Sequence, residues 1–317
     1  MNEVRTVLTG RGLVESPRWH DGRLYFSDWS AGEVVAVDLA GRSEVVAYVK
    51  SLPLCTAFLP DGTLVIVSSP DGRLLRREPD GSLVTHADLG QPGWNDIVVD
   101  GRGHIYVNRV GFNPTAGEEF QPGFVFMVAG DGSVGQVADD IAFPNGMAVT
   151  ADNSTLIVAD SYRHNLVAFD IGADGTLSNR RIWADLGDGV PDGICADEQN
   201  AVWYADVPNQ RCVRVARGGR ILRTVGLDRG GFACMLGGPR RTTLFVVAAT
   251  WQGITESEMV APGSGQVLAV DVDVPGQAGR DGRPRAEATR QLDRCRPLGS
   301  SHVPGISRSQ VAEGEEG

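Results

Sequence analysis

The sequence predicts an all-β protein, a six-bladed β-propeller with four-stranded blades around a central channel. Six segments repeat one pattern, in which a small or polar residue opens an apolar stretch that leads through a turn into further β-rich runs. Successive segments begin 40 to 50 residues apart, and this spacing is typical of propeller blades. The 41 Gly and 17 Pro residues also favour short strands and tight turns over long helices.

The six segments define the blades in chain order. They start at Glu15, Cys55, Asn95, Asn145, Asp192 and Cys234. The first contains Glu-Ser-Pro-Arg-Trp and then Leu-Tyr-Phe-Ser-Asp, the second Cys-Thr-Ala-Phe-Leu-Pro-Asp-Gly and then Leu-Val-Ile-Val, and the third Asn-Asp-Ile-Val-Val-Asp-Gly and then Ile-Tyr-Val-Asn. The longest interval follows Asn95, because it holds an insertion rich in Gly, Pro and Glu at residues 111–123.

The domain boundaries follow from the repeat. We expect residues 1–272 to form a single propeller domain, because packing between blades gives one continuous core. Residues 2–8 have no local partner, so we expect them to complete the last blade as its outer strand and to remove an exposed edge. Residues 273–317 are rich in Gly, Pro and Arg and end in acidic residues, and this composition predicts an irregular C-terminal tail.

The charge and the apolar pattern exclude several classes of partner. Asp and Glu number 40 against 29 Lys and Arg, and the net charge of −11 has the wrong sign for binding nucleic acid or an anionic membrane. No apolar run reaches the ~18 residues of a membrane span, and the first residues lack a signal-peptide pattern. We therefore expect a cytoplasmic protein, a monomer or a weak homo-oligomer, whose partner is a small molecule.

Several catalytic motifs are absent from the sequence. There is no Gly-x-Ser-x-Gly elbow and no His-Glu-x-x-His, which removes support for serine-hydrolase and zinc-histidine sites. The five Cys residues are scattered without a Cys-x-x-Cys pair, so we interpret them as free thiols.

The repeat brings chemically similar residues together. Equivalent residues of successive blades lie on a ring, and those that start the innermost strands face the mouth of the channel. Four of the six carry side-chain oxygen, namely Glu15, Asn95, Asn145 and Asp192. This all-oxygen set suits a hard divalent cation, Ca²⁺ first, with Mg²⁺, Mn²⁺ or Zn²⁺ as alternatives. Cys55 and Cys234 share the ring, and we interpret both as buried structural cysteines because sulfur is a poor Ca²⁺ ligand.

Four motifs occur in order across roughly residues 10–272: Glu15-Ser-Pro-Arg-Trp, Trp94-Asn-Asp-Ile-Val-Val-Asp-Gly, Phe143-Pro-Asn-Gly-Met and Val190-Pro-Asp-Gly-Ile-Cys. In these motifs the sequence resembles the senescence marker protein, regucalcin and gluconolactonase family. The resemblance implies a six-bladed propeller with a divalent metal held by Glu15, Asn145 and Asp192, with Asn95 nearby in the metal or substrate shell. It also implies hydrolysis of a small-molecule lactone, with Asp192 as the general base.

One position departs from the family pattern. Sugar-lactone members carry an arginine two residues before the asparagine that matches Asn95, and here that position is Gly93, followed by Trp94. Because a cation is missing and apolar surface is added, we expect a preference for less polar lactones. The residues expected to bind the substrate are Asn95, Trp94, Arg18, Asn108 and Arg109.

Other functions fit parts of the same pattern. A related metal-dependent esterase or organophosphatase would use the same metal. A non-catalytic calcium-binding propeller would bind metal without turnover, and a lyase or synthase on this fold would need no metal. Asn and Asp are also common turn residues, so a purely structural ring is the alternative to a metal site.

Overall fold

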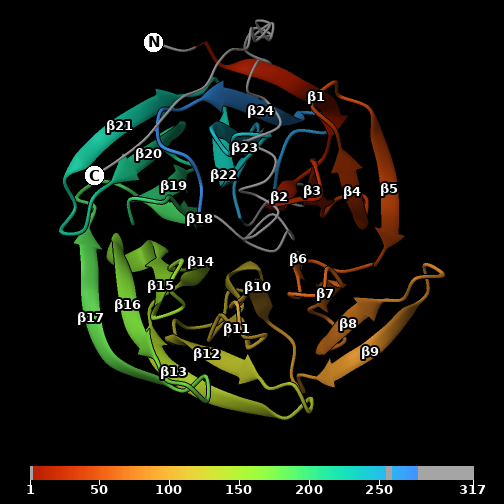
Figure 1. Cartoon of the computed structure of the whole chain (residues 1–317), viewed down its shortest axis with the longest axis vertical. Helices are drawn as coiled ribbons and strands as arrows, with labels where there is room; N and C mark the ends of the chain where they lie inside the picture. Colours follow the sequence, from red (N-terminus) through yellow and green to blue (C-terminus); the bar gives the residue numbers. More distant parts are fainter. Residues whose placement is uncertain (1–2, 255–258, 278–317) are drawn as a thin grey trace, which may run out of the picture. The chain divides into compact units, whose positions relative to one another are not determined.

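The computed structural model of this protein describes residues 3–254 and 259–277. In these residues six four-stranded sheets surround a central axis like the blades of a propeller (Figure 1). The predicted all-β class, the six blades and the four strands in each blade are therefore confirmed. The helical elements of the described residues are two short 3₁₀ turns, η1 (Pro114–Ala116) and η2 (Ser161–Arg163).

Each of the first five blades consists of four consecutive strands, numbered from the channel outward. Blade 1 is formed by β2 Val14–His20, β3 Arg23–Asp28, β4 Glu33–Val37 and β5 Ser43–Tyr48. Blade 2 is formed by β6 Leu54–Phe58, β7 Leu64–Ser68, β8 Arg73–Arg77 and β9 Leu83–Asp88. Blade 3 is formed by β10 Trp94–Val99, β11 Ile105–Arg109, β12 Gly123–Val128 and β13 Val134–Ile141. Blade 4 is formed by β14 Pro144–Val149, β15 Thr155–Asp160, β16 Asn165–Ile171 and β17 Leu177–Asp185, and blade 5 by β18 Pro191–Ala196, β19 Val202–Asp206, β20 Arg211–Val215 and β21 Ile221–Gly226.

Blade 6 is completed by the N-terminus of the chain. Its order from the channel outward is β22 Gly230–Gly237, β23 Thr243–Ala249, β24 Gly265–Asp271 and β1 Arg5–Arg11. Strand β1 runs antiparallel to β24, with Arg5 opposite Ala269 and Arg11 opposite Gly265. The predicted closure by an N-terminal outer strand is confirmed, although the strand reaches Arg11 rather than ending at residue 8. This pairing covers the edge of β24, which would otherwise offer unpaired backbone groups.

Local chemistry explains the short strands. In blade 2 the turn after β6 uses Asp61, whose Oδ1 accepts a hydrogen bond from the backbone N of Thr63 at 2.9 Å, and Gly62, whose φ of +89° favours glycine. The second strands, such as β7 and β23, are buried along their whole length because blades pack against both of their faces. Their sequences therefore read as unbroken apolar runs rather than as alternating patterns.

The core of the described residues lies between neighbouring blades. One apolar cluster joins Val67 and Leu74 of blade 2 to Trp94 and Ile97 of blade 3, and corresponding clusters join the other neighbouring pairs. Each fully buried side chain of this size contributes about 1.5 to 3 kcal/mol. The blades consequently hold one another in place, and the inner strands are fixed around the channel.

The chain remains packed beyond the predicted boundary at residue 272. Val272 and Gln277 are buried, and the backbone N of Gly276 donates to the carbonyl of Arg241 at 2.9 Å. The packed C-terminal segment therefore continues to Gln277. The remainder of the predicted irregular tail, residues 278–317, lies outside the described residues.

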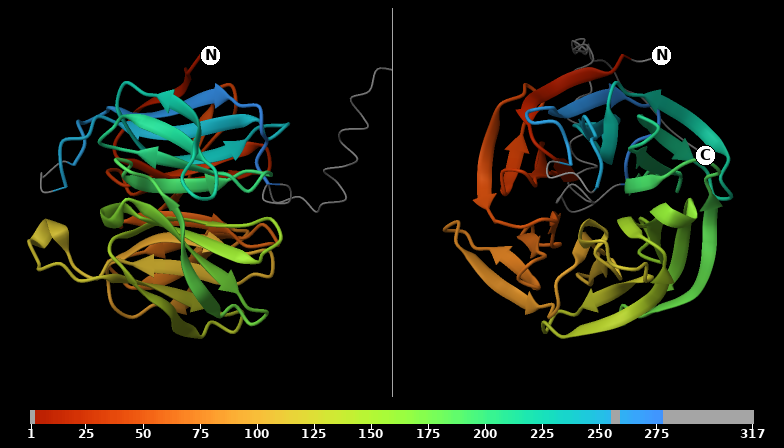
Figure 2. Two further views of the ribbon diagram at one scale, coloured as in Figure 1. Left: turned by 90° about the vertical axis from the view of Figure 1, so that its left-hand side faces the viewer. Right: turned by 180° about the vertical axis from the view of Figure 1, so that it is seen from behind.

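Two long connections extend from the same face of the propeller (Figure 2). One is the predicted insertion, which joins β11 to β12, and the other comprises residues 250–254 and 259–264 between β23 and β24. None of the described helical turns has the length and apolar character needed to cross a membrane. The cytoplasmic location and the monomeric or weakly oligomeric state stay predictions.

Candidate functional site

A cavity of about 620 Å³ lies at the end of the channel between the two long connections. Its floor consists of polar side chains from the inner strands, and its walls come largely from the connections. All four oxygen-bearing residues of the predicted ring line the cavity, as do both cysteines assigned to that ring. These residues are Glu15, Asn95, Asn145, Asp192, Cys55 and Cys234.

A β-bulge follows the ring position in most inner strands. The strand pairing shifts by one residue in β2, β10, β14, β18 and β22, whereas β6 pairs without a shift. A bulge bends its strand and redirects the neighbouring side chains. The same local feature therefore turns the ring residues of several blades toward the channel.

The register corrects the ring position in blade 6. Cys234 pairs with Val246, three residues before the end of β23, just as Cys195 pairs with Trp203, three residues before the end of β19. Cys234 is therefore equivalent to Cys195, and the residue equivalent to Asp192 is Gly231. The repeat in blade 6 lacks a polar starting residue, which is why the sequence pattern placed its start too late.

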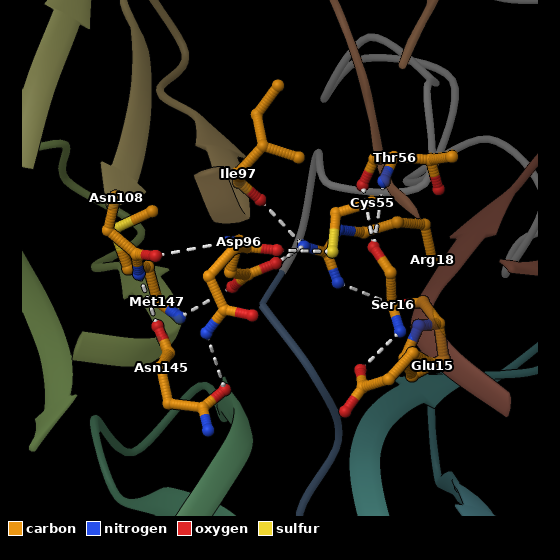
Figure 3. A network of polar contacts seen from close by, with 12 residues as sticks. Glu15, Ser16, Arg18, Cys55, Thr56, Asp96, Ile97, Asn108, Asn145 and Met147 are labelled. Carbon is orange, nitrogen blue, oxygen red and sulfur yellow. Dashed lines mark hydrogen bonds and ion pairs between the residues drawn. The ribbon is translucent and has the colours of Figure 1, made fainter. Parts of the chain in front are cut away.

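Glu15 is held by a strained neighbour. Glu15 is 8% exposed, and its carboxylate accepts a hydrogen bond from the backbone N of Ser16 at 2.6 Å. Ser16 has a φ of +52°, a conformation that serine rarely adopts and that concentrates at functional sites. The Ser16 Oγ accepts from the N of Thr56 at 2.8 Å and donates to its carbonyl at 3.2 Å, which ties β2 to β6 (Figure 3). Sequence reasoning missed Ser16, although it follows Glu15 directly in the first motif.

Asn95, Asn145 and Asp192 complete the ring from blades 3, 4 and 5. Asn95 Nδ2 donates to the carbonyl of Pro144 at 3.1 Å and lies 3.5 Å from Asn145 Oδ1. Asn145 Nδ2 lies 3.4 Å from the Oγ of Ser161. Asp192 is partly buried, and desolvation raises its pKa well above the usual range, with the charges of nearby carboxylates acting in the same direction.

Asp96 links four strands across the floor, and sequence reasoning missed it. Arg18 Nη2 donates to Asp96 Oδ1 at 3.1 Å and to the carbonyl of Ile97 at 2.7 Å. Asp96 Oδ2 accepts from the N of Met147 at 2.9 Å, and its backbone N donates to Asn108 Oδ1 at 3.0 Å (Figure 3). Asp96 stands beside Asn95 in the second motif, and this was the signal that could have identified it.

Two residues expected to bind substrate have partners within the protein. Arg18 lines the cavity, but its guanidinium is paired with Asp96 and the carbonyl of Ile97. Asn108 is fully buried away from the cavity, where its Nδ2 donates to the carbonyl of Asn145. Both residues therefore position the ring.

The floor carries an excess of negative charge when its acids are ionised. Three carboxyl groups, Glu15, Asp96 and Asp192, act on one another, and the guanidinium of Arg18 acts on Glu15 and Asp96. Burial raises the pKa of Glu15 to about 8 and also raises those of Asp96 and Asp192, because desolvation disfavours charged groups. No three His, Cys, Asp or Glu side chains of the described residues are arranged to hold a metal by themselves. A metal at this floor would therefore need the amide oxygens of Asn95 or Asn145.

Residues 13–250 match the protein family described as SMP-30/Gluconolactonase/LRE-like region. The chain belongs to this family. The resemblance seen in the four sequence motifs is thereby confirmed, and the matched region spans all four ring residues of the floor.

Members of the SMP-30/gluconolactonase family share much of their length with this chain. Regucalcin from Xenopus laevis is 29% identical over 251 residues, which cover 75% of this chain and 83% of regucalcin. Pentonolactonase XacC from Haloferax volcanii is 24% identical over 258 residues, which cover 73% of this chain and 86% of that protein. The crystal structure of regucalcin, a calcium-binding protein from Agrobacterium tumefaciens, matches with a TM-score of 0.73 at 22% identity, over 87% of this chain and 96% of that one. This structural likeness supports the shared propeller fold.

Arg109 lies beside Gly93, the position at which the sequence departs from the family pattern. A Cβ at Gly93 would lie 3.5 Å from Arg109 Nε and 3.6 Å from Arg109 Cγ, so the Arg109 side chain runs beside this glycine. Arg109 lines the cavity, and its buried Nε has no hydrogen-bond partner in the part of the chain that the structure describes. The cavity therefore retains a cation at this side, supplied by β11.

Trp94 lies in the core rather than in the cavity. It is 1% exposed and packs edge-on against Phe126, with ring centres 5.0 Å apart. Successive residues of a strand point to opposite faces, so the placement of Asn95 in the channel directs Trp94 toward the packing between blades. Trp94 thus stabilises the blade that carries Asn95 and does not line the cavity.

The two cysteines assigned to the ring are buried, as predicted. Burial raises the pKa of both thiols well above the usual range. Cys55 Sγ donates to the carbonyl of Asn95, and Cys234 Sγ lies 3.8 Å from Cys195 Sγ. Protonated, hydrogen-bonded thiols fit a packing role.

Proposed function

We propose that this protein is a lactonase in which Glu15, Asn145 and Asp192 hold a divalent cation, Asn95 lies beside it, and Asp192 is the general base. The family and the pentonolactonase relative support hydrolysis of a lactone. The observation that carries the metal assignment is the cluster of three carboxyl groups, Glu15, Asp96 and Asp192, at the floor of an open cavity, where Arg18 is paired with Asp96. Ionising all of them leaves a net charge that a divalent cation would neutralise.

The donor set fits a hard cation. Carboxylate and amide oxygens are the ligands that Ca²⁺ prefers, and Ca²⁺ takes about 6 to 8 of them, which leaves positions for water and substrate. When bound, the cation would neutralise the floor and polarise the ester carbonyl. The protonated thiols of Cys55 and Cys234 make a thiolate-bound metal a poor alternative.

Side chains of the floor would carry out proton transfer and substrate orientation. Asp192 lines the cavity from the start of β18, where its carboxylate would be placed to act as a general base toward water. Asp192 accepts a proton from the attacking water as the water oxygen bonds to the carbonyl carbon. The ring C–O bond then breaks while Asp192 returns that proton to the leaving oxygen, which gives a hydroxy acid whose new carboxyl group ionises to a carboxylate. Asn95 and Asn145 orient the ester, because carboxamides do not accept protons at neutral pH.

We propose that Arg109 binds the carboxylate that ring opening creates. Its guanidinium lines the same cavity as Asn95, Asn145 and Asp192 and has no hydrogen bond or ion pair with the described residues. A guanidinium binds a carboxylate through two parallel hydrogen bonds, a geometry that few other side chains offer.

A pH-indicator assay across lactones, aryl esters and organophosphate triesters tests the proposal. We expect chelator-treated protein to be inactive toward every lactone and to recover when Ca²⁺ is added, with Mg²⁺, Mn²⁺ and Zn²⁺ compared in parallel. Turnover of the esters or triesters alone would favour an esterase or organophosphatase, and calcium binding without turnover would favour a binding protein. Undiminished lactone hydrolysis after chelation would refute the metal assignment.

A further inference from the structure

Four aromatic rings form a continuous cluster at the rim of the cavity. They are Phe112, Phe120, Phe143 and Tyr162. Phe143 and Tyr162 stack with ring centres 4.7 Å apart, and Phe112 meets Phe120 edge-on at 5.5 Å. Phe120 and Tyr162 are each 50% exposed. Such a group of exposed rings at a cavity marks a surface that a ligand can cover.

Three connections of the fold build this cluster over the site. Phe112 and Phe120 belong to the insertion between β11 and β12, whereas Phe143 and Tyr162 flank β14 and β15 of blade 4. Phe112 and Phe143 line the cavity directly, and Phe143 stands two residues before Asn145. The aromatic cluster is therefore continuous with the polar floor.

The wall on the other side of the channel is also apolar. Blade 6 stands across the axis from blade 3 (Figure 1), and its Phe232 and Trp251 meet edge-on at 5.7 Å and line the cavity. Trp251 is 37% exposed, and Leu52, which lines the cavity from the connection between β5 and β6, is 50% exposed. The upper cavity thus lies between two apolar walls, while most of its charged groups lie at the floor and at Arg109.

We propose that the aromatic cluster binds an aryl or branched-alkyl substituent of the substrate, so that the preferred substrate is a lactone whose ring carries such a group. This inference rests on the proposed lactonase function and names its substrate class. The reacting ester lies at the floor, and the substituent extends between Phe112 and the wall of blade 6. A polyhydroxylated sugar lactone would bury hydroxyl groups against carbon without hydrogen-bond partners, which is unfavourable. The same preference was expected from Gly93 and Trp94, but the aromatic cluster supplies it through different residues.

Kinetics on three substrates test this substrate class in the metal-loaded protein. We expect kcat/KM for γ-phenyl-γ-butyrolactone to exceed that for γ-butyrolactone and for glucono-δ-lactone. Phe112→Ala should raise KM for the phenyl lactone by about tenfold, the size of an aromatic contact. Tyr162→Ala, which removes the ring stacked on the cavity-lining Phe143, should raise it in the same direction, and both should change KM for γ-butyrolactone much less. Tyr48→Ala is the matched control, because Tyr48 is 70% exposed on the outer strand β5 and does not line the cavity.

Calorimetric binding of the corresponding phenyl-substituted γ-lactam separates the substrate class from the chemistry, because a lactam is not hydrolysed under these conditions. Lactam binding that Phe112→Ala and Tyr162→Ala weaken and Tyr48→Ala preserves supports the aromatic site, even if no lactone is opened and the proposed function fails. Equal or better turnover of glucono-δ-lactone, with lactam affinity insensitive to both rim variants, would overturn the inference.

Discussion

Without divalent cations, this protein should lose stability as the pH rises from about 6 to about 8, and Glu15 should cause much of the loss. Burial raises the pKa of Glu15 from 4.5 to about 8. In this range the unfolded chain has already lost the proton, while the folded chain still binds it. A carboxyl group with a raised pKa therefore contributes stability that is complete below its unfolded pKa and is lost as the pH rises through its folded pKa.

The expected size follows from the shift. Each pH unit between the two pKa values corresponds to about 1.4 kcal/mol, so moving from about pH 6 to about pH 8 should cost about 2 kcal/mol, allowing for partial protonation at the upper end. For a propeller of this size that is a fall in Tm of about 4 to 8 °C. Saturating Ca²⁺ should abolish the loss, because a bound cation favours the ionised carboxylate.

The assay is thermal and urea unfolding of chelator-treated protein at both pH values, with Glu15→Gln as the control. The variant retains size and one oxygen but has no proton to lose, so subtracting its pH dependence leaves the contribution of Glu15 together with its effect on the neighbouring Asp192. The difference should be about 2 kcal/mol. Equal pH dependence in wild type and Glu15→Gln would show that Glu15 is already ionised in the metal-free fold and would refute the reasoning.

Three further outcomes are expected. Asp192→Asn should lower turnover by about 10² to 10⁴ even at saturating Ca²⁺, whereas added Ca²⁺ should partly restore Glu15→Gln; equal recovery in calcium titrations would make Asp192 a ligand only. Arg109→Met should raise the inhibition constant of the hydroxy-acid product about tenfold or more with Tm unchanged, since its guanidinium has no partner among the described residues, and a large Tm loss would assign it a structural role. A chain ending at Asp271 should melt about 5 to 10 °C below one ending at Gln277, because it loses the buried Val272 and the hydrogen bond of Gly276; equal melting would show that this segment adds nothing.

The repeat predicted those features that depend on local pattern and equivalence between blades. A period of 40 to 50 residues was sufficient to predict the six blades and the closure by β1, because every blade repeats the same strand and turn chemistry. The same equivalence brought Glu15, Asn95, Asn145 and Asp192 to one cavity. Their predicted roles as metal ligands and base stay predictions.

The sequence repeat does not predict contacts between side chains of different blades. The pairing of Arg18 with Asp96 crosses the channel, and no local signal reveals that this arginine is satisfied while Arg109 is not. Trp94 lies in the core because it alternates with Asn95 along β10, so the two neighbours of the motif do not share the cavity. The sequence does not predict the aromatic cluster, because Phe112 and Tyr162 lie in separate connections and come into contact only in the folded chain.

The closure of blade 6 also determines when the site comes into existence during synthesis. A ribosome delivers β1 first and β24 last, so the N-terminal strand waits for its partner until nearly all the propeller has emerged. Joining such distant ends adds little entropic cost, because that cost rises only with the logarithm of the separation, but non-local pairing slows folding. Since the floor combines Glu15 of the first blade with Asp192 of the fifth, a nascent chain that lacks β24 would contain every residue of the site before the circle that assembles them is closed.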